Sequence, residues 1–260
     1  MNVLDQVWGK KGLQFIFQKL YAFALKGMNY GRAGDYMFNG EGPLIQSIRS
    51  MVSSRTCVLF DVGANKGEFT RKVMEEWLGM NYHLYVFEPA EKSFEILRQT
   101  VQSPGYVYFF KLGFGEAPGM MDLYSNEEGS GLASLYQRDL SHHNIDFSKR
   151  ETIEVTTIDL FCEQNRIEHI DFLKLDVEGH ELAVLKGAHK MLSAGRIQIV
   201  QFEFGGCNID SRTFFRDYYN FFRKDFQLYR VLSNGLLPIE DYSEKLEVFQ
   251  SANYLAVRKD

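Results

Sequence analysis

The stretch that decides the fold is residues 58–67, Val58-Leu59-Phe60-Asp61-Val62-Gly63-Ala64-Asn65-Lys66-Gly67. It begins with an apolar run and continues into a turn that contains two glycines. Phe69, Val73 and Trp77 follow at a spacing of four residues, which predicts a helix. In an open α/β sheet, the backbone approaches a nucleotide-like ligand at the first strand-to-helix turn, where glycine leaves room for the ligand. The stretch therefore predicts a strand, a ligand-binding turn and a helix.

The same alternation continues toward the carboxyl end. Strand-like runs at residues 58–60 and 84–87 alternate with helical patterns at residues 69–78 and 94–101. Strands that alternate with helices predict a mainly parallel sheet with helices on both faces. Residues 113–152 are rich in glycine, serine and charge, which predicts a loop or hairpin insert. Further strands are expected at residues 106–111, 153–157, 172–175, 197–204, 227–231 and 254–257.

Composition narrows the class of protein. The 260 residues are 45% hydrophobic and 24% charged, which predicts a globular chain. Its length suits an N-terminal helical extension over residues 1–50 and one α/β domain over residues 51–260. The formal net charge of -5 argues against binding to phosphate backbones, so we expect no nucleic-acid partner. Cys57, Cys162 and Cys207 are far apart and form no C-x-x-C pair, which predicts neither disulfides nor a zinc ribbon.

The first thirty residues form a distinct segment. From Leu13, apolar residues recur at Ile16, Phe17, Leu20 and Ala24, on one side of a predicted helix. Four lysines interrupt the segment, so no run approaches the roughly 20 residues of a membrane span, and no signal-peptide layout is present. We therefore expect a cytoplasmic protein without a transmembrane segment. The helix could lie on an anionic membrane surface, pack on its own domain or pack on a second copy of the chain.

A second signal concerns the ligand of the turn. Glu88 ends the apolar strand at residues 84–87 and lies 27 positions after Asp61. An acidic residue at this place can accept hydrogen bonds from a ribose diol. The middle glycine of a G-x-G-x-x-G fingerprint is missing, and no G-K-[ST] sequence follows, so neither a dinucleotide loop nor a Walker loop is indicated. The two signals together predict a site for a nucleoside-containing ligand.

Four stretches of the chain carry a family resemblance: DVGANKGEF at 61–69, YVFEPAEKSFEIL at 85–97, TIDLF at 157–161 and FLKLDVEGHELAVLKGA at 172–188. They resemble the FkbM family of S-adenosylmethionine-dependent methyltransferases. An earlier segment, NGEGPLI at residues 39–45, also resembles many members. The resemblance implies a Rossmann-like class I fold, with a seven-stranded sheet, one antiparallel strand and S-adenosylmethionine at the carboxyl ends of the first strands.

The resemblance also implies roles for single residues in cofactor binding. It assigns Glu88 to the ribose and, less directly, Glu41 to the same pocket. The run Leu112-Gly113-Phe114-Gly115 departs from the family pattern, which leaves open which residue flanks the adenine. The residues assigned to the loop around the methionine end of the cofactor are Asp61, Gly63, Asn65 and Gly67.

The run from Asp176 to Glu181 would carry the chemistry. It follows the apolar strand at residues 172–175, at the edge of the sheet where ligands bind. A hydroxyl acceptor must lose a proton during methyl transfer, and His180 is the predicted base, with Asp176 or Glu178 orienting it or the substrate. Asp176, Glu178 and Glu203 could alternatively bind a divalent cation such as Mg²⁺ through oxygen. A purely structural alternative is that the acids cap the helix that begins near Glu181.

Two further clusters receive mainly structural interpretations. His142 and His143 are adjacent in the insert and lack the usual spacing of metal ligands. Ser211 is a plausible N-cap for a helix rich in aromatic residues. One face of that helix is expected to pack against the sheet. The residues of this face are Phe215, Tyr218, Tyr219 and Phe222.

These features predict an S-adenosylmethionine-dependent O-methyltransferase. Resemblance to the family implies a hydroxyl on a sugar, glycan or secondary metabolite as acceptor, and we favour a carbohydrate. A non-catalytic S-adenosylmethionine-binding subunit is the first alternative, although the polar run beside the expected methyl position argues against it. A nucleotide-dependent oxidoreductase is the second alternative, and the missing middle glycine argues against it.

Overall fold

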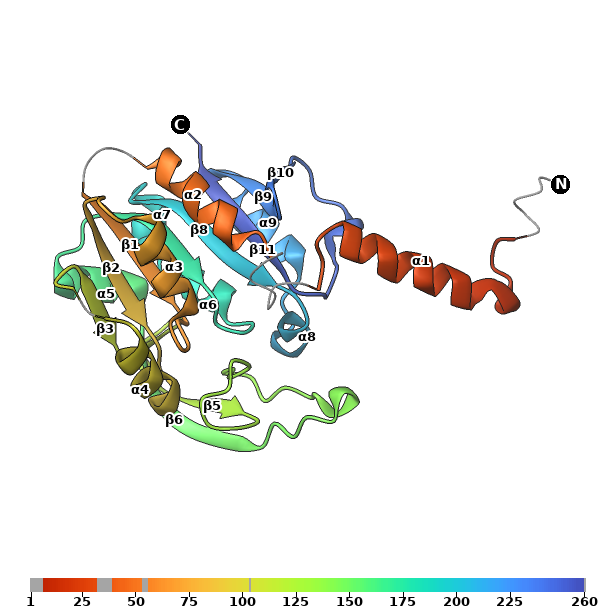
Figure 1. The fold of residues 1–260 in the computed structure, drawn as a ribbon, viewed down its shortest axis with the longest axis horizontal. Helices are drawn as coiled ribbons and strands as arrows, with labels where there is room; N and C mark the ends of the chain where they lie inside the picture. Colours follow the sequence, from red (N-terminus) through yellow and green to blue (C-terminus); the bar gives the residue numbers. More distant parts are fainter. Residues whose placement is uncertain (1–6, 32–38, 53–55, 103, 260) are drawn as a thin grey trace.

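The computed structural model describes residues 7–31, 39–52, 56–102 and 104–259. The first six residues of the predicted N-terminal extension lie outside this part. The centre of the structure is a sheet of eight strands in the order β10-β9-β11-β8-β7-β1-β2-β3 (Figure 1). The strands are β1 (Cys57–Val62), β2 (Tyr82–Phe87), β3 (Val107–Phe110), β7 (Ile170–Leu175), β8 (Ile197–Phe204), β9 (Phe226–Leu232), β10 (Gly235–Ile239) and β11 (Ala252–Arg258).

Strand directions identify the sheet as Rossmann-like. β3, β2, β1, β7 and β8 pair in parallel, and β11 pairs antiparallel with both β8 and β9. The expected pattern of seven strands with one antiparallel member, β11, is present. In addition, β10 forms an eighth strand that pairs antiparallel with β9 at the edge of the sheet. A two-residue turn, Ser233–Asn234, reverses the chain there, and Pro238 suits an edge strand.

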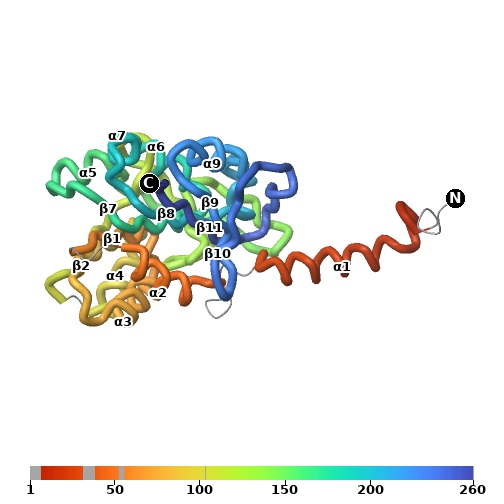
Figure 2. The backbone as a smooth tube through the Cα atoms, turned by 90° about the horizontal axis from the view of Figure 1, so that it is seen from above, coloured from red at the N-terminus to blue at the C-terminus, as the bar shows by residue number. Residues whose placement is uncertain are grey.

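Helices cover both faces of the sheet (Figure 2). The alternation of side chains along β1 separates the two cores, because Cys57 and Leu59 face one cluster while Val58, Phe60 and Val62 face the other. The first cluster packs under α2 (Glu41–Met51), α3 (Glu68–Glu76) and α4 (Glu91–Thr100). The second packs under α5 (Ile158–Asn165), α6 (Glu181–Lys186), α7 (His189–Ser193) and α9 (Phe215–Phe222).

The insert forms a second, smaller sheet. β4 (Gly113–Phe114), β6 (Lys149–Thr156) and β5 (Gly119–Ser125) lie side by side in that order. The long connection between β5 and β6 contains a 3-10 turn, η3 (Ser141–His143). The strand expected at residues 153–157 therefore belongs to this sheet and not to the central one. Figure 1 shows β5 and β6 of the insert below the central sheet, on the side toward which β1 runs.

The N-terminal helix stands away from the domain. A 3-10 turn, η2 (Lys11–Leu13), leads into α1 (Gln14–Gly27), and both views show α1 projecting from the body (Figures 1 and 2). Leu25 is the buried residue of α1. No helix in the described part of the chain combines the length and apolar character needed to span a bilayer.

The aromatic helix α9 packs as predicted, but its start differs from the prediction. Phe215, Tyr218 and Phe222 are fully buried. Ser211 ends the preceding helix, α8 (Cys207–Ser211), and is not the N-cap. The first N–H groups of α9 donate instead to a carboxylate distant in sequence, Glu247, which no local pattern could indicate.

A close contact between two glycines, Gly187 after α6 and Gly115 in the insert, provides a test of how the insert packs on the central domain. An added Cβ at Gly187 would lie 2.0 Å from the carbonyl oxygen of Gly115, whereas one at Gly119 would meet nothing within 4 Å. In Gly187→Ala, the backbone at residue 187 and the backbone at Gly115 would have to move apart. We expect it to lower the free energy of unfolding by about 1–3 kcal/mol in urea titrations. Gly119→Ala is the matched control, and an equal loss in both variants would contradict the packing.

Candidate active site

The turn between β1 and α3 is shaped by a close backbone contact. Gly63 has φ +83°, and an added Cβ would lie 1.9 Å from the carbonyl oxygen of Asp176. The N–H groups of Gly63 and Ala64 both donate to the carbonyl oxygen of Phe87 at 3.0 Å. The turn therefore joins the ends of β1, β2 and β7 and requires glycine at position 63. Gly67 also has φ +83° and begins α3 from the left-handed region.

Asp61, predicted to contact the cofactor, lies behind the turn. Its side chain is fully buried and accepts a hydrogen bond from the Thr70 hydroxyl at 2.6 Å. Burial raises the pKa of this carboxyl. This hydrogen bond connects the end of β1 to α3. The observed contacts of Asp61 therefore stabilise the turn from within the protein.

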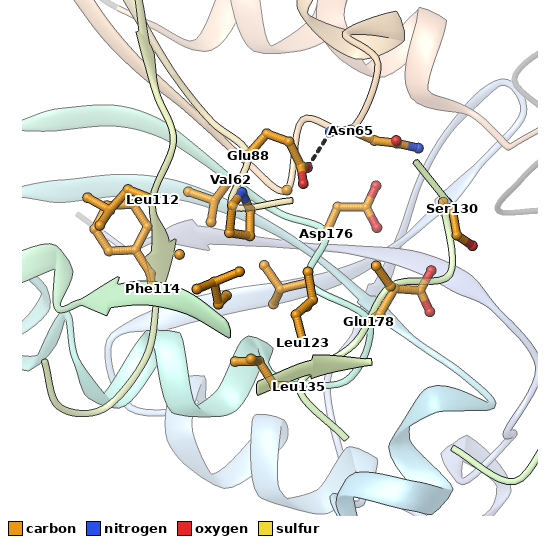
Figure 3. A pocket seen from close by; sticks show the side chains of 17 residues that line it. Val62, Asn65, Glu88, Leu112, Phe114, Leu123, Ser130, Leu135, Asp176 and Glu178 are labelled. Carbon is orange, nitrogen blue, oxygen red and sulfur yellow. Dashed lines mark hydrogen bonds between the residues drawn. The ribbon is translucent and has the colours of Figure 1, made fainter. Parts of the chain in front are cut away.

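Glu88 lies at the end of β2 beside the turn, as predicted. One carboxylate oxygen accepts a hydrogen bond at 2.8 Å from the N–H of Asn65 (Figure 3). The other accepts from the N–H of Ala90, also at 2.8 Å. Burial raises the pKa of Glu88 to about 7, although the two N–H donors oppose the shift. The Ser93 hydroxyl donates to the side chain of Asn65 at 3.2 Å. The carboxylate is thus held in a fixed position with further lone pairs available to a ligand.

An apolar pocket opens next to Glu88. Figure 3 shows Leu112, Phe114 and Leu135 gathered on one side of it, and the carboxylates of Asp176 and Glu178 on the other. Leu112, Gly113 and Phe114 all line this pocket, so the run that departs from the family pattern supplies its wall. We call this region the apolar pocket. Its other nonpolar side chains are Val62, Pro89, Leu123, Ala133, Ile153 and Val177.

An acidic pocket adjoins the apolar one. Gly63, Asn65, Gly131, Asp176 and Glu178 line both pockets, so the two form adjoining parts of one cleft. Carboxylates predicted from three separate parts of the sequence meet in the acidic pocket. They are Glu41, Asp176, Glu178 and Glu203.

One buried cation balances much of this negative charge. Lys174 forms an ion pair with Asp176 at 2.7 Å, and its side chain is 5% exposed. Burial opposes the charged form of Lys174, but Asp176, Glu41 and Asp61 together raise its pKa. Its ammonium group also lies 4.8 Å from the centre of the Phe69 ring. Lys174 therefore remains charged beneath the acidic pocket.

Glu41 and Glu203 line the same pocket. Glu41 begins α2 and accepts hydrogen bonds at 2.8 Å from the side-chain amides of Asn39 and Gln201. Burial raises the pKa of Glu41. Burial also raises the pKa of Glu203, and the nearby charges of Glu178 and Asp176 add to the shift. The pocket therefore strongly favours a positively charged or proton-donating ligand group.

Glu178 has an unusual backbone and a cationic partner. Its backbone φ is +50°, a conformation that residues other than glycine rarely adopt. The Arg138 guanidinium lies 2.7 Å from its carboxylate, and the Ser134 hydroxyl donates to its carbonyl oxygen at 2.7 Å. Burial, followed by the charge of Asp176, raises the pKa of Glu178 to about 8 against the opposing effect of Arg138. The insert thus holds the loop after β7 in place.

Glu181 stabilises the same loop. The sequence predicts for Glu181 only that a helix begins near it. One carboxylate oxygen accepts from the N–H groups of Val177 and Gly179 at 3.1 and 3.2 Å. The Tyr218 hydroxyl donates to the other at 3.3 Å. Burial raises the pKa of Glu181 to about 8. The E-x-x-E spacing gives no indication of this role, because the partners come from the loop itself and from α9.

His180 lies apart from both pockets. It lines a separate recess together with Tyr136 and Glu116, and its Nδ1 is 3.2 Å from the Tyr136 hydroxyl. Among the described residues, its Nε2 has no hydrogen-bond partner; it faces Gly115, where an added Cβ would lie 3.0 Å away. Burial lowers the pKa of His180 to about 4. The structure therefore does not bring His180 together with Asp176 and Glu178 at the cleft, and its catalytic role stays a prediction.

The predicted divalent-cation site does not form in this geometry. Among the described residues, no three or more His, Cys, Asp or Glu side chains are arranged to hold a metal ion. Asp176 pairs with Lys174 and Glu178 pairs with Arg138, so the nearest cations to these carboxylates are side chains. The rings of His142 and His143 contact each other in η3 at a tilt of 45°, and both residues are exposed on the insert.

The buried acids predict a pH dependence of stability. The folded-state pKa of Glu181 is about 8 against an ordinary value of 4.5, so the folded chain holds its proton over a range where the unfolded chain releases it. Stability is then lost as the pH rises from about 5 to 8. Glu181→Gln, which keeps the acceptor for the loop, should flatten this decline by up to about 1.4 kcal/mol per pH unit in thermal unfolding. Parallel curves for both proteins would contradict the assignment.

Comparisons with known proteins agree with this architecture. Residues 61–231 match the family described as the methyltransferase FkbM domain. The 2-O-methyltransferase NoeI of Sinorhizobium fredii is 24% identical over 160 residues, which cover 58% of this chain and 65% of NoeI. The hexuronic acid methyltransferase AglP of Haloferax volcanii is 28% identical over 149 residues, which cover 57% of this chain and 56% of AglP. The chain thus matches less than two thirds of the length of either relative.

A solved structure gives a further comparison. The crystal structure of methyltransferase FkbM from Methylobacillus flagellatus is 17% identical, with a TM-score of 0.48, and the match covers 78% of this chain and 44% of that one. The family match is the stronger finding, since it includes the glycine turn, Glu88 and the loop after β7. Because that match extends over more than half of the sequence, this chain belongs to the FkbM methyltransferase family.

Proposed function

We propose that this chain transfers a methyl group from S-adenosylmethionine to a hydroxyl oxygen of a sugar or glycan. The observation that carries the proposal is the cleft itself, in which an apolar pocket with a fixed carboxylate, Glu88, adjoins a strongly acidic pocket. Adenine, a ribose diol and a positively charged sulfonium group require surroundings of these three kinds in this order. Membership of the FkbM methyltransferase family supports the same chemistry.

The residues of the cleft fit this cofactor. The apolar pocket, with Leu112 and Phe114 in its wall, would hold the adenine, and Glu88 would accept from the ribose hydroxyls. The turn at Gly63 and Asn65 would lie along the methionine part, with Glu41 and Asp176 favouring the positive charges. The cofactor supplies an electrophilic methyl group, so the protein mainly aligns the acceptor oxygen with it.

The acceptor class is supported by the relatives. NoeI is named a 2-O-methyltransferase and AglP a hexuronic acid methyltransferase. We therefore favour a carbohydrate hydroxyl over the hydroxyl of another secondary metabolite. The polar, acidic part of the cleft suits a substrate with many hydroxyl donors, because ionised carboxylates act as hydrogen-bond acceptors.

Proton removal from the acceptor is assigned here to Glu178, with Asp176 orienting the hydroxyl. Both carboxylates line the cleft, and the pKa of Glu178, about 8, suits a general base near neutral pH. His180 fits this role less well, because burial lowers its pKa to about 4 and its recess is separate. Divalent-cation dependence is not part of the proposal, since Lys174 and Arg138 already neutralise these carboxylates.

The cellular setting forms a separate part of the proposal. We place the protein in the cytoplasm because its three cysteines are buried, far apart in the sequence and without a C-x-x-C pair, as suits a reducing compartment. Its formal net charge of -5 supports an acceptor other than nucleic acid. A non-catalytic S-adenosylmethionine-binding subunit remains the alternative, and it differs from the proposal in having no turnover on any sugar acceptor.

The proposed hydrogen bond between Glu88 and the ribose can be tested by comparing two ligands on two proteins. Glu88→Gln should weaken binding of S-adenosylhomocysteine by about 10- to 100-fold, because a charge-assisted hydrogen bond is lost. The 2′-deoxy analogue should bind wild type more weakly than the parent compound but lose little further affinity in the variant. Glu91→Gln, an exposed change three residues along the chain, serves as the control. Equal losses for both ligands in Glu88→Gln would indicate a distorted turn and contradict ribose recognition.

The base assignment predicts a pH profile. With a sugar acceptor, kcat/KM should rise with pH and level off above about 8, as Glu178 loses its proton. Glu178→Gln should reduce kcat by roughly 10²- to 10⁴-fold and remove that rise. His180→Gln should retain the rise even if its rate falls. A profile that disappears in His180→Gln and persists in Glu178→Gln would reverse the assignment.

A further inference from the structure

The N-terminal arm, defined as residues 7–28, carries an apolar face that no other described part of the chain covers. Both overall views show its helix extending from the body into solvent (Figures 1 and 2). Ile16, Leu20 and Phe23 follow the helical spacing of four and three residues and are 42%, 56% and 77% exposed. Phe15 and Tyr21 extend this surface and are equally open. Such a continuous row of exposed apolar side chains is typical of an interaction surface.

The arm is also the most basic part of the described chain. Residues 7–31 contain four lysines and no aspartate or glutamate, although the whole chain has a formal net charge of -5. All four lysines are exposed, and none forms an ion pair with a carboxylate among the described residues. Lys19 and Lys26 are seven residues apart and therefore share one side of α1, beside the apolar row. The lysines are Lys10, Lys11, Lys19 and Lys26.

The charge distinguishes an anionic lipid surface from the arm of a second copy as partners of this face. A second copy of the arm would bring four more lysines and no acidic residue, so two arms would repel each other. An anionic phospholipid surface instead offers phosphate groups to the lysines and an acyl boundary to Phe23 and Leu20. The 14 residues of α1 are too few to cross a bilayer, but they suit a helix that lies in the interface.

We propose that the N-terminal arm docks the protein on an anionic phospholipid surface, with α1 lying in the plane of the headgroups. Trp8, stacked on Phe17 at 5.7 Å between ring centres, adds an aromatic group of the kind enriched at such interfaces. The proposal is independent of the methyl-transfer chemistry, because none of the arm residues that carry it lines either pocket of the cleft.

The root of the arm connects it firmly to the domain. Leu25 and Tyr30 are both 2% exposed and belong to the main core. The Arg230 guanidinium stacks on the Tyr30 ring at 4.5 Å and also donates to its hydroxyl. The N–H of Gly31 donates to the carbonyl oxygen of Ser251 at 2.9 Å, and Ser251 lines the acidic pocket. A docked arm would therefore hold the cleft at a fixed distance from the lipid surface.

Vesicle sedimentation with the full chain tests the proposal. We expect binding to vesicles of phosphatidylcholine mixed with phosphatidylglycerol, and little binding to pure phosphatidylcholine. The triple change Lys10→Gln, Lys19→Gln and Lys26→Gln should weaken that binding at least about tenfold. Phe15→Ser combined with Phe23→Ser should also weaken it, and more so at high salt, where the electrostatic attraction is screened. All of these side chains are exposed, so the fold should be retained and circular dichroism should match wild type.

Matched controls separate the arm from general charge and hydrophobicity. Lys149→Gln, Lys190→Gln and Lys224→Gln remove the same charge from exposed positions elsewhere, and Leu78→Ser with Met120→Ser removes exposed apolar groups. These controls should bind as wild type does. The proposal is overturned if wild type does not bind the anionic vesicles, or if the controls lose as much as the arm variants. It is equally overturned if the protein is a dimer in solution that Phe15→Ser with Phe23→Ser converts to monomer.

Discussion

The close approach of Gly63 to the carbonyl oxygen of Asp176 is the contact on which the rest of the site depends. The two residues end neighbouring parallel strands, and the contact leaves no space for a Cβ at position 63. It brings the turn after β1 against the first residue after β7, so the cofactor loop and the candidate catalytic loop form one edge of the sheet. Glu88, at the end of β2, joins the same edge through the N–H of Asn65. An arrangement of this kind requires strands in the order β2, β1, β7.

The second constraint is electrostatic. The cleft collects more carboxylates than a buried site can hold as free anions, because each loses hydration. Lys174 compensates Asp176, Glu41 and Asp61 from below, and Arg138 compensates Glu178 from the insert. Glu181 forms no ion pair within the described part of the chain, and its carboxylate accepts hydrogen bonds from two loop N–H groups and the Tyr218 hydroxyl. The site therefore presents carboxylates to its ligand, while cationic and hydrogen-bonding groups of the protein compensate much of their charge from the other side.

Features set by local patterns were predictable from the sequence, and features set by contacts between distant segments were not. The β1 turn, α1 and the buried face of α9 follow from apolar spacing and glycine, and the structure confirms them. The β10 hairpin was missed because its apolar run is short. The partnership of Arg138 with Glu178 spans 40 residues and depends on how the insert folds back, which no spacing records. His180 was grouped with Asp176 and Glu178 by adjacency, but the positive φ of Glu178 and Gly179 turns the chain between them.

Binding of an adenosyl sulfonium cofactor in the cleft is the property that every proposed role depends on, and calorimetry on the purified chain measures it. The titration compares S-adenosylmethionine, S-adenosylhomocysteine and NAD, each with and without magnesium. We expect micromolar binding of both adenosyl compounds, without a requirement for magnesium, and no comparable binding of NAD. Failure of both adenosyl compounds to bind would contradict the proposed function and would leave the turn from Asp61 to Gly67 as a structural element or a site for another nucleotide.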